Sequence, residues 1–232
     1  MKRPANPVTV LSAAVVVAAV VVAVGATWLV PYGINDVDVP QALRPPSGAH
    51  WFGTDELGRD VLSRVLTGLQ ASMTVAVVSV VCAAVVGIAL GVGAGYRGGW
   101  VDTVVMRVVD VMFAFPVLLL AMAIVAVLGP GLATTIAAIS VVYVPIFARV
   151  ARASTLAVRE EPYVAVSRTM GTGTGYILAR HVLPNITGPL IVQTSLSLAF
   201  AILSEAALSF LGLGIQPPQP SLGRMIFDSQ GF

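Results

Sequence analysis

Two acidic side chains lie inside apolar stretches of the sequence, where a charge is costly. Glu205 lies in the run Leu190–Leu213 and Asp110 lies in Val104–Leu128. An acid at the centre of a membrane span costs about 2.5–3.5 kcal/mol on insertion scales, so each must face protein or water. Glu205 is either a pathway or gating residue or a structural hydrogen-bonding group. Asp110 is either part of an ion relay or the local ion-pair partner of Arg107, three residues earlier.

The sequence lacks the residues that other kinds of chemistry require. The sequence contains no Gly-x-Ser-x-Gly and no Cys/His cluster, and its only lysine is Lys2, so the Gly-Lys-Ser/Thr of a Walker A loop is missing. His50 and His181 are expected on opposite sides of a membrane and form no metal pair. Cys82 has no intrachain disulfide partner, and the run VVCAAVV predicts a buried thiol that packs as a small hydrophobe.

A polar, arginine-bearing stretch, Glu160–Pro184, separates two apolar segments. Glu160 and Glu161 suit the positive end of a helix, Pro162 its first position and Gly171 its C-cap. The sequence therefore predicts a short helix, a flexible break at 172–175 and a second short helix over 176–182. Pro184 is expected to begin the entry to the next span.

The first short helix has an apolar face formed by Tyr163, Val166 and Met170. A helix of about nine residues is marginal alone in water and needs a partner surface. The face either docks on another protein or packs on the ends of neighbouring spans.

The composition indicates that the surface of this chain is largely in contact with lipid. Of 232 residues, 57% are hydrophobic and 10% charged, whereas soluble domains have about 25% charged residues. The net charge of +2 is too small to indicate nucleic-acid binding. The first apolar run is longer than the 7–15 residues of a signal-peptide core. Five predicted spans are Val8–Val30, Met73–Tyr96, Val104–Leu128, Leu132–Ala148 and Leu190–Leu213.

Basic residues orient these spans. With the N-terminus inside, nine basic residues are internal and four external, which favours a cytoplasmic N-terminus. The internal ones are Lys2, Arg3, Arg97, Arg107, Arg149, Arg152, Arg159, Arg168 and Arg180, and the external ones Arg44, Arg59, Arg64 and Arg224. The Glu160–Pro184 loop is then cytoplasmic. Trp28, Tyr32, Tyr96 and Trp100 fit interfacial anchors, and Trp100 with Asp102 indicates an interfacial turn.

The external segment 31–70 has two parts. Prolines and Gly48 predict an irregular loop in its first part. Thr54 as a cap, followed by Asp55 and Glu56, predicts a helix in its second part. That helix has an apolar face made of Leu57, Val61, Val65, Leu66 and Leu69. It is expected to lie at the outer interface, either as a packing element or as a contact surface for an external partner.

The polar loop resembles the EAA loop of ABC-importer permeases: EAA, three residues, Gly, nine residues, then I-x-L-P. On this alignment the triplet falls on Ala165, Val166 and Ser167, the glycine on Gly171, and the last four positions on His181, Val182, Leu183 and Pro184. The glycine, leucine and proline match. Ala165 replaces the glutamate and His181 the isoleucine.

Five further stretches resemble the C-type transmembrane subunit of bacterial dipeptide and oligopeptide importers. They are HWFGTDELGRDVLSR (50–64), GYRGGWVDTVVMRVVDVMFAFP (95–116), REEPYV (159–164), RHVLPN (180–185) and SEAALSFLGLGIQPPQPSLG (204–223). The resemblance implies an all-α polytopic bundle of the type I importer kind in a bacterial plasma membrane. Relatives of this type also carry nickel or haem, so it does not fix the cargo.

The resemblance implies partners as well: a second permease, two cytoplasmic ATPase subunits that use ATP and Mg²⁺, and an external binding protein. The loop would be the coupling helix that docks on an ATPase, through the Tyr163/Val166/Met170 face, with Arg159 and Arg168 pairing to acidic groups. Glu160 or Glu161 would stand in for the glutamate that Ala165 lacks. Glu205, if structural, would bond to the partner permease or the outer loop.

The resemblance also frames the domain organisation. Residues 1–71 hold the first span and outer loop, 72–213 the core with the cytoplasmic loop 149–189, and 214–232 a further outer loop. The family has six spans and only five are visible, so a truncated sequence is expected. The rival function is an ion-coupled secondary transporter that uses Glu205 and Asp110 and predicts transport without ATP.

Overall fold

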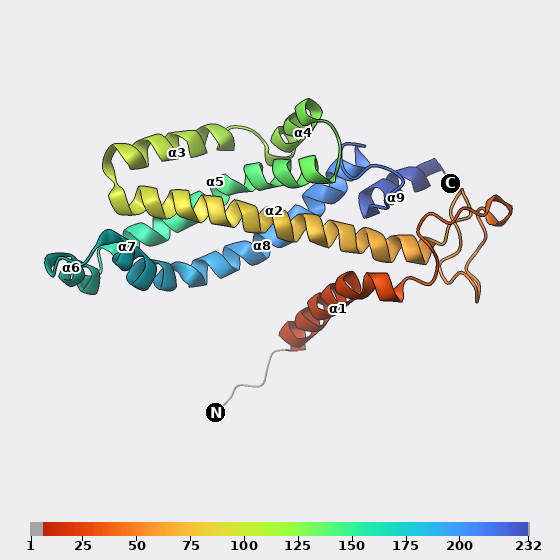
Figure 1. The fold of residues 1–232 in the computed structure, drawn as a ribbon, viewed down its shortest axis with the longest axis horizontal. Coiled ribbons are helices and arrows are strands. Elements are labelled where there is room, and N and C mark those ends of the chain that lie inside the picture. The colour runs from red at the N-terminus through yellow and green to blue at the C-terminus, as the bar shows by residue number, and fades with distance from the viewer. Residues whose placement is uncertain (1–6, 232) are drawn as a thin grey trace. The chain divides into compact units, whose positions relative to one another are not determined.

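The apolar sequence folds almost wholly into helices (Figure 1). The computed structural model describes residues 7–231, with side chains from Val10 onward. In this part the regular elements are all helical, apart from one isolated antiparallel bridge between Thr54 and Asp60. They are α1 (Pro7–Leu29), η1 (Val39–Gln41), α2 (Val61–Arg97), α3 (Gly99–Phe113), α4 (Val117–Leu128), α5 (Leu132–Arg159), α6 (Pro162–Thr169), α7 (Thr174–Ile177), the π-helix η2 (Leu178–Val182), α8 (Leu183–Phe210), α9 (Leu222–Asp228) and η3 (Ser229–Gly231).

Four helices are long and apolar enough to cross a membrane: α1, α2, α5 and the continuous helix Thr174–Phe210. A fifth candidate span is the bent pair of α3 and α4. All five predicted apolar runs therefore fall in helices, and the predicted all-α membrane fold is confirmed. α2 has 37 residues, or about 55 Å at 1.5 Å per residue, which exceeds the thickness of a bilayer core of about 30 Å.

The predicted span Val104–Leu128 is not one continuous helix. α3 and α4 are bent by 89° at the break that follows Phe113. Pro116 precedes α4 with an extended backbone (φ −56°, ψ 131°). A proline has no N–H to donate and disfavours helical geometry in the residue before it, so the helix ends there despite its apolar sequence.

The described chain forms two compact units. The first contains the described residues up to Val75, residues 130–132, and those from Glu205 onward; the second contains 76–129 and 133–204. α2, α5 and α8 each contribute residues to both. The whole 160–184 loop belongs to the second unit.

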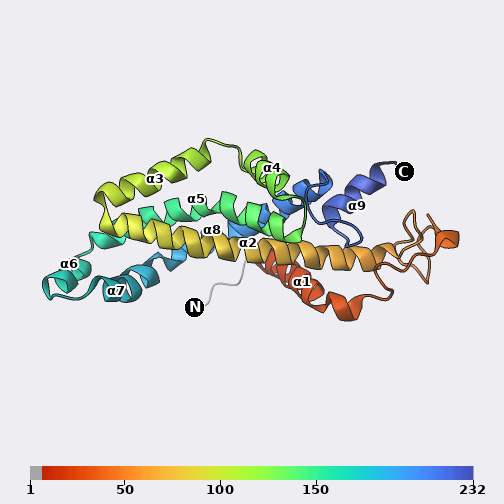
Figure 2. The same cartoon turned by 45° about the horizontal axis from the view of Figure 1, so that its top comes forward.

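The second unit depends on close contact between α2 and α5, which run side by side (Figure 2). Gly87, Gly91 and Gly95 recur every four residues on one face of α2. A Cβ added at Gly91 would lie 2.3 Å from the backbone oxygen of Ala148, and one at Gly87 would lie 2.6 Å from that of Val144. Small residues at this spacing allow two helix backbones to approach closely.

Cys82 lies on an open face of α2, which corrects the prediction for this residue. Its thiol is exposed rather than buried. Cys82 stands nine residues before Gly91, which at 3.6 residues per turn is about 180° around the helix. It therefore lies on the face opposite the α5 contact.

In the first unit, the predicted helix beginning at Thr54 is wrong. α2 begins at Val61, and Leu57 precedes it in a turn. The Thr54 hydroxyl caps no helix: it accepts the Arg44 N–H at 2.9 Å and donates to the carbonyl of Gln41. Thr54 thus links two segments of the loop before α2 by hydrogen bonds. The spacing of residues in the sequence does not reveal these bonds.

Asp60 is the residue that caps α2. Its Oδ2 accepts the Ser63 N–H at 2.8 Å and the Ser63 hydroxyl at 2.6 Å, while Oδ1 lies 3.0 Å from His50 Nδ1. Burial raises the pKa of this carboxyl, but the hydrogen bonds from Ser63 and His50 outweigh burial and hold the pKa below its ordinary value. The Tyr32 ring lies 4.8 Å from that of His50. The HWFGTDELGRD motif therefore caps α2 and is bonded to the loop that precedes it.

Candidate functional site

α6 is defined at both ends by the residues that predict it. Pro162 takes the first helical position after Glu161, whose backbone is extended. Gly171 has φ +78°, in the left-handed region that favours glycine. The Thr172 N–H donates to the Ser167 carbonyl at 3.1 Å and the Gly171 N–H to that of Arg168 at 3.0 Å, the two bonds of a Schellman motif. The predicted first helix and its glycine cap are confirmed.

The second short helix is not separate, which corrects the prediction for 176–182. α7 continues through η2 into α8 as one helix, Thr174–Phe210. At the junction the Leu183 N–H reaches back to the carbonyl of Leu178. A proline at 184 needs room against the carbonyl four residues earlier, and the wider π-turn provides that room.

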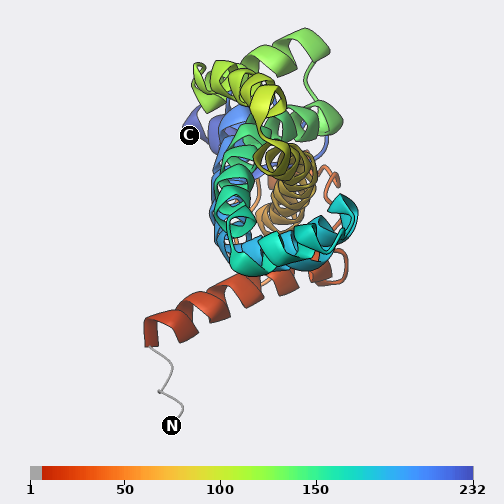
Figure 3. The same ribbon diagram turned by 90° about the vertical axis from the view of Figure 1, so that its left-hand side faces the viewer.

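The predicted apolar face of α6 is exposed. Tyr163, Val166 and Met170 are 40%, 55% and 79% exposed. Val164 is the residue that α6 buries, and Ala165 is exposed. Figure 3 looks from the end of the second unit at which α6 lies, with α6 in the foreground. The alternative in which this face packs on the ends of neighbouring spans is therefore wrong for Val166 and Met170, which are more than half exposed, but holds for Tyr163, whose ring lies 5.8 Å from that of His181.

Both arginines that flank α6 contact the C-terminal end of α2. The Arg168 Nε donates to the Tyr96 hydroxyl at 3.2 Å, and its guanidinium carbon lies 4.7 Å from the centre of the Tyr96 ring. Arg159 Nη1 donates to the carbonyls of Gly95 and Tyr96, each at 3.2 Å. These arginines were expected to pair with acidic groups of a partner; both are engaged within the chain.

Two departures from the EAA pattern lie together. The Ser167 hydroxyl is 3.4 Å from His181 Nε2, and it also donates to the Tyr163 carbonyl at 2.8 Å. The His181 ring lies 5.8 Å from the ring of Tyr163 and 5.9 Å from that of Tyr176. His181 therefore joins α6 to η2 by a polar contact and two aromatic contacts.

Neither Glu160 nor Glu161 forms the contacts within the loop that are expected of a residue standing in for the missing glutamate. The Glu160 carboxylate accepts from Arg159 Nε at 3.2 Å and is three-quarters exposed. Glu161 occupies the N-cap position without a side-chain capping bond. The hydrogen bonds that fix α6 come from Ser167 and Arg168 instead.

Glu205 lies in the first unit and is fully buried. Its carboxylate accepts hydrogen bonds from three hydroxyls: Ser72 of α2, Ser209 one turn later at 2.7 Å, and Ser221 before α9 at 3.2 Å. Three donors satisfy a buried carboxylate well. The contact with Ser221, in the segment after α8, is of the structural kind expected for Glu205.

Asp110 pairs with a different arginine from the one predicted. Its carboxylate accepts from Arg149 of α5 at 2.9 Å, and both side chains are more than half exposed. The predicted pairing of Asp110 with Arg107 is therefore wrong. Tertiary packing places Arg149 beside α3 instead, where its guanidinium also lies 3.9 Å from the centre of the Phe113 ring. Asp102 lies in the first turn of α3, not in a turn between helices, and holds Arg152 through both carboxylate oxygens.

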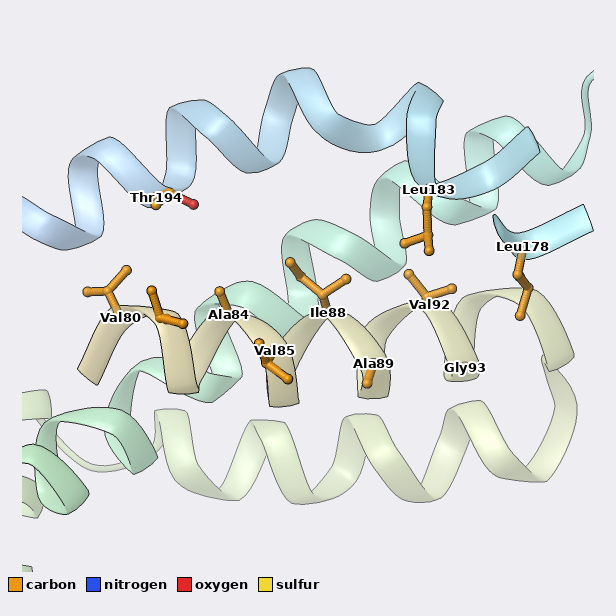
Figure 4. A pocket seen from close by; sticks show the side chains of 11 residues that line it. Val80, Ala84, Val85, Ile88, Ala89, Val92, Gly93, Leu178, Leu183 and Thr194 are labelled. Atoms are coloured by element: carbon orange, nitrogen blue, oxygen red, sulfur yellow. The ribbon is translucent and has the colours of Figure 1, made fainter. Parts of the chain in front are cut away.

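An apolar groove of about 550 Å³ runs beside the start of α8 in the second unit (Figure 4). α2 lines it from Val80 to Gly93, and Leu178, Leu183 and Thr194 close the other side. Thr194 is its only polar side chain. The groove offers no charged group for the termini of a peptide, so its chemistry suits lipid or an apolar helix.

Sequence reasoning missed the residues that hold α6. The local sequence indicates only an interfacial anchor at Tyr96 and a mismatch to the EAA pattern at His181. The four-residue glycine repeat is visible in the sequence; the contacts of Tyr96 and His181 join residues 72 and 14 positions apart and leave no local signal.

These observations define a multi-span helical membrane protein with a short, exposed helix held between two spans. Residues 87–232 match the family described as "Binding-protein-dependent transport system inner membrane component". The chain belongs to this family.

Individual relatives agree. The chain is 40% identical over 227 residues to a dipeptide transport system permease protein of Alkalihalophilus pseudofirmus. The matched region covers 98% of this chain and 75% of that protein. A probable D,D-dipeptide transport system permease protein of Escherichia coli K12 is 41% identical, with 98% and 76% covered. A glutathione transport system permease protein of Pectobacterium atrosepticum is 41% identical, with 91% and 70% covered.

Proposed function

We propose that this chain is one of the two membrane-spanning subunits of an ATP-driven importer of short peptides, and that the 160–184 loop couples it to an ATPase subunit. The observation that carries the proposal is the exposed Tyr163/Val166/Met170 face on a short helix that starts at a proline and ends in a glycine cap. An eight-residue helix that leaves its apolar side uncovered is suited to a groove on another protein.

The orientation belongs to the same proposal. Nine basic residues against four favour a cytoplasmic N-terminus, and the loop then faces the cytoplasm, where ATP is available. ATP and Mg²⁺ are handled by the partner ATPases, and this chain binds no metal or cofactor of its own. A second permease and an external binding protein complete the complex.

The names of the relatives, which transport dipeptides or glutathione, support a peptide cargo over nickel or haem. Their family depends on a binding protein, which argues against an ion-coupled transporter. The acids that such a relay would need are occupied: Glu205 by three hydroxyls and Asp110 by Arg149.

Reconstitution tests the proposal. The complex with its second permease, ATPases and binding protein is placed in vesicles, and uptake of dialanine and of glutathione is measured with and without ATP. We expect uptake of at least one peptide only with ATP, and loss of uptake in Val166→Asp and Met170→Asp while ATP hydrolysis continues. Uptake driven by a proton or sodium gradient without ATP, or full uptake in both variants, would contradict it.

A further inference from the structure

Tyr96 is the residue at which α6 is attached to the body of the second unit. It is the penultimate residue of α2, and two arginines contact it, one at the end of α5 and one in α6. Arg159, just before α6, donates to its carbonyl at 3.2 Å, and Arg168, in the last turn of α6, donates to its hydroxyl at 3.2 Å. The guanidinium of Arg168 also lies over the ring.

These contacts anchor the chain just before α6 and the last turn of α6. Arg159 is the last residue of α5, three positions before α6 begins at Pro162, and Arg168 lies inside α6. A helix of two turns does not fix its own direction by hydrogen bonding alone. Anchoring the end of α5 to the Tyr96 backbone and the last turn of α6 to the Tyr96 side chain restricts both the position and the angle of α6. The carbonyls that receive Arg159 are the negative end of the α2 dipole, which favours a cation there.

The other side of α6 has a separate attachment. Ser167 lies 3.4 Å from His181 Nε2, and the His181 ring touches the rings of Tyr163 and Tyr176. α6 is thus held to α2 by Tyr96 and to η2 by His181. Since the position of the EAA glutamate carries the exposed Ala165, these two contacts do the holding in this chain.

We propose that Tyr96 is a positioning residue for energy coupling: through the contact of its side chain with Arg168 it transmits a displacement of α6 to α2. The inference rests on the coupling role proposed above. α2 carries the displacement onward because Gly91 and its neighbouring glycines place it in direct backbone contact with α5. Loosening Tyr96 leaves the docking face intact and makes the motion of α6 ineffective.

The experiment measures dialanine transported per ATP hydrolysed in the reconstituted complex. Arg168→Ala and Tyr96→Ala are each expected to lower this ratio about fivefold, which corresponds to about 1 kcal/mol. Tyr96→Phe keeps the ring under the guanidinium and should restore the ratio to within about twofold of wild type. The double variant should be no worse than either single one, because both remove the same contact.

Two matched controls separate the contact from general effects. Arg180→Ala removes an exposed arginine of the same loop, and Tyr176→Phe removes an exposed tyrosine hydroxyl. Both should keep the wild-type ratio. A fivefold loss in Arg180→Ala, or losses that multiply in the Arg168/Tyr96 double variant, would overturn the inference.

A further comparison distinguishes failure of the inference from failure of the proposed function. If Val166→Asp lowers the ratio and Tyr96→Ala does not, the loop couples but Tyr96 does not position it. If neither lowers the ratio, the coupling role itself fails. Backbone hydrogen exchange of α6 then decides the attachment: faster exchange in Tyr96→Ala but not in Tyr176→Phe supports positioning by Tyr96, and equal exchange overturns it.

Discussion

Glu205 and the 160–184 loop are two places where polar residues interrupt an apolar sequence, and their surroundings differ. The Glu205 carboxylate has no exposure and three hydroxyl donors. α6 has a glycine cap at its C-terminus and its Arg168 engaged by Tyr96, yet Val166 and Met170 are open, with Met170 79% exposed. A polar group that is fully satisfied inside the protein stabilises the fold, whereas an apolar face left open on a firmly held helix is available to a partner.

Removing the Glu205 carboxylate should have the largest effect on stability. Glu205→Ala leaves the hydroxyls of Ser72, Ser209 and Ser221 buried without their acceptor, and each such loss costs about 1–3 kcal/mol. We expect a loss of about 3 kcal/mol in the free energy of unfolding, measured by circular dichroism in mixed SDS micelles. Glu205→Gln keeps one acceptor oxygen and should lose less than half as much. An alanine variant as stable as wild type would remove the structural side of the comparison.

The contact between α2 and α5 should have the second-largest effect on stability. A Cβ at Gly91 meets the Ala148 oxygen at 2.3 Å, whereas nothing lies within 4 Å of one at Gly93. Gly91→Ala is expected to destabilise the chain by about 2 kcal/mol, within the range for overpacking. Gly93→Ala should be neutral or slightly stabilising, because alanine favours helix more than glycine does. The same unfolding measurement checks both, and equal values would show that α2 and α5 do not need their close approach.

Asp60 is a second satisfied carboxylate and should have a smaller effect. Asp60→Ala removes the cap of α2 and should cost about 1 kcal/mol at pH 7. Because the pKa of Asp60 is lowered on folding, its contribution is present above the unfolded value near 3.8 and is lost as the pH falls below it. Melting curves from pH 7 to 3 should show a shallower acid loss in Asp60→Asn, which retains a capping side chain. An unchanged acid profile would contradict this.

The smallest effect on stability is expected at the open face of α6. Val166→Ser and Met170→Ser change exposed side chains, and such surface substitutions usually alter stability by no more than about 0.5 kcal/mol. The same variants should lose co-purification of the ATPase if the face docks on it. A large loss of stability would instead indicate that the face packs within this chain, and it would end the contrast with Glu205.

The sequence alone determined the helical membrane class, the approximate positions of the spans, and α6 with its proline start and glycine cap. These follow from local composition, apolar run length and the backbone preferences of Pro162 and Gly171, none of which depends on distant contacts. The bend between α3 and α4 also has a local cause, Pro116. The continuous apolar run over 104–128 nevertheless predicts a single span there.

Only the tertiary structure decided which polar groups meet. Asp110 pairs with Arg149 and not Arg107, and Ser221 reaches Glu205 across 16 residues. The attachment of Arg168 to Tyr96 spans 72 residues. Long side chains on packed helices choose among several partners by geometry, and that geometry is set by how closely the helix backbones approach, here through the glycine face of α2.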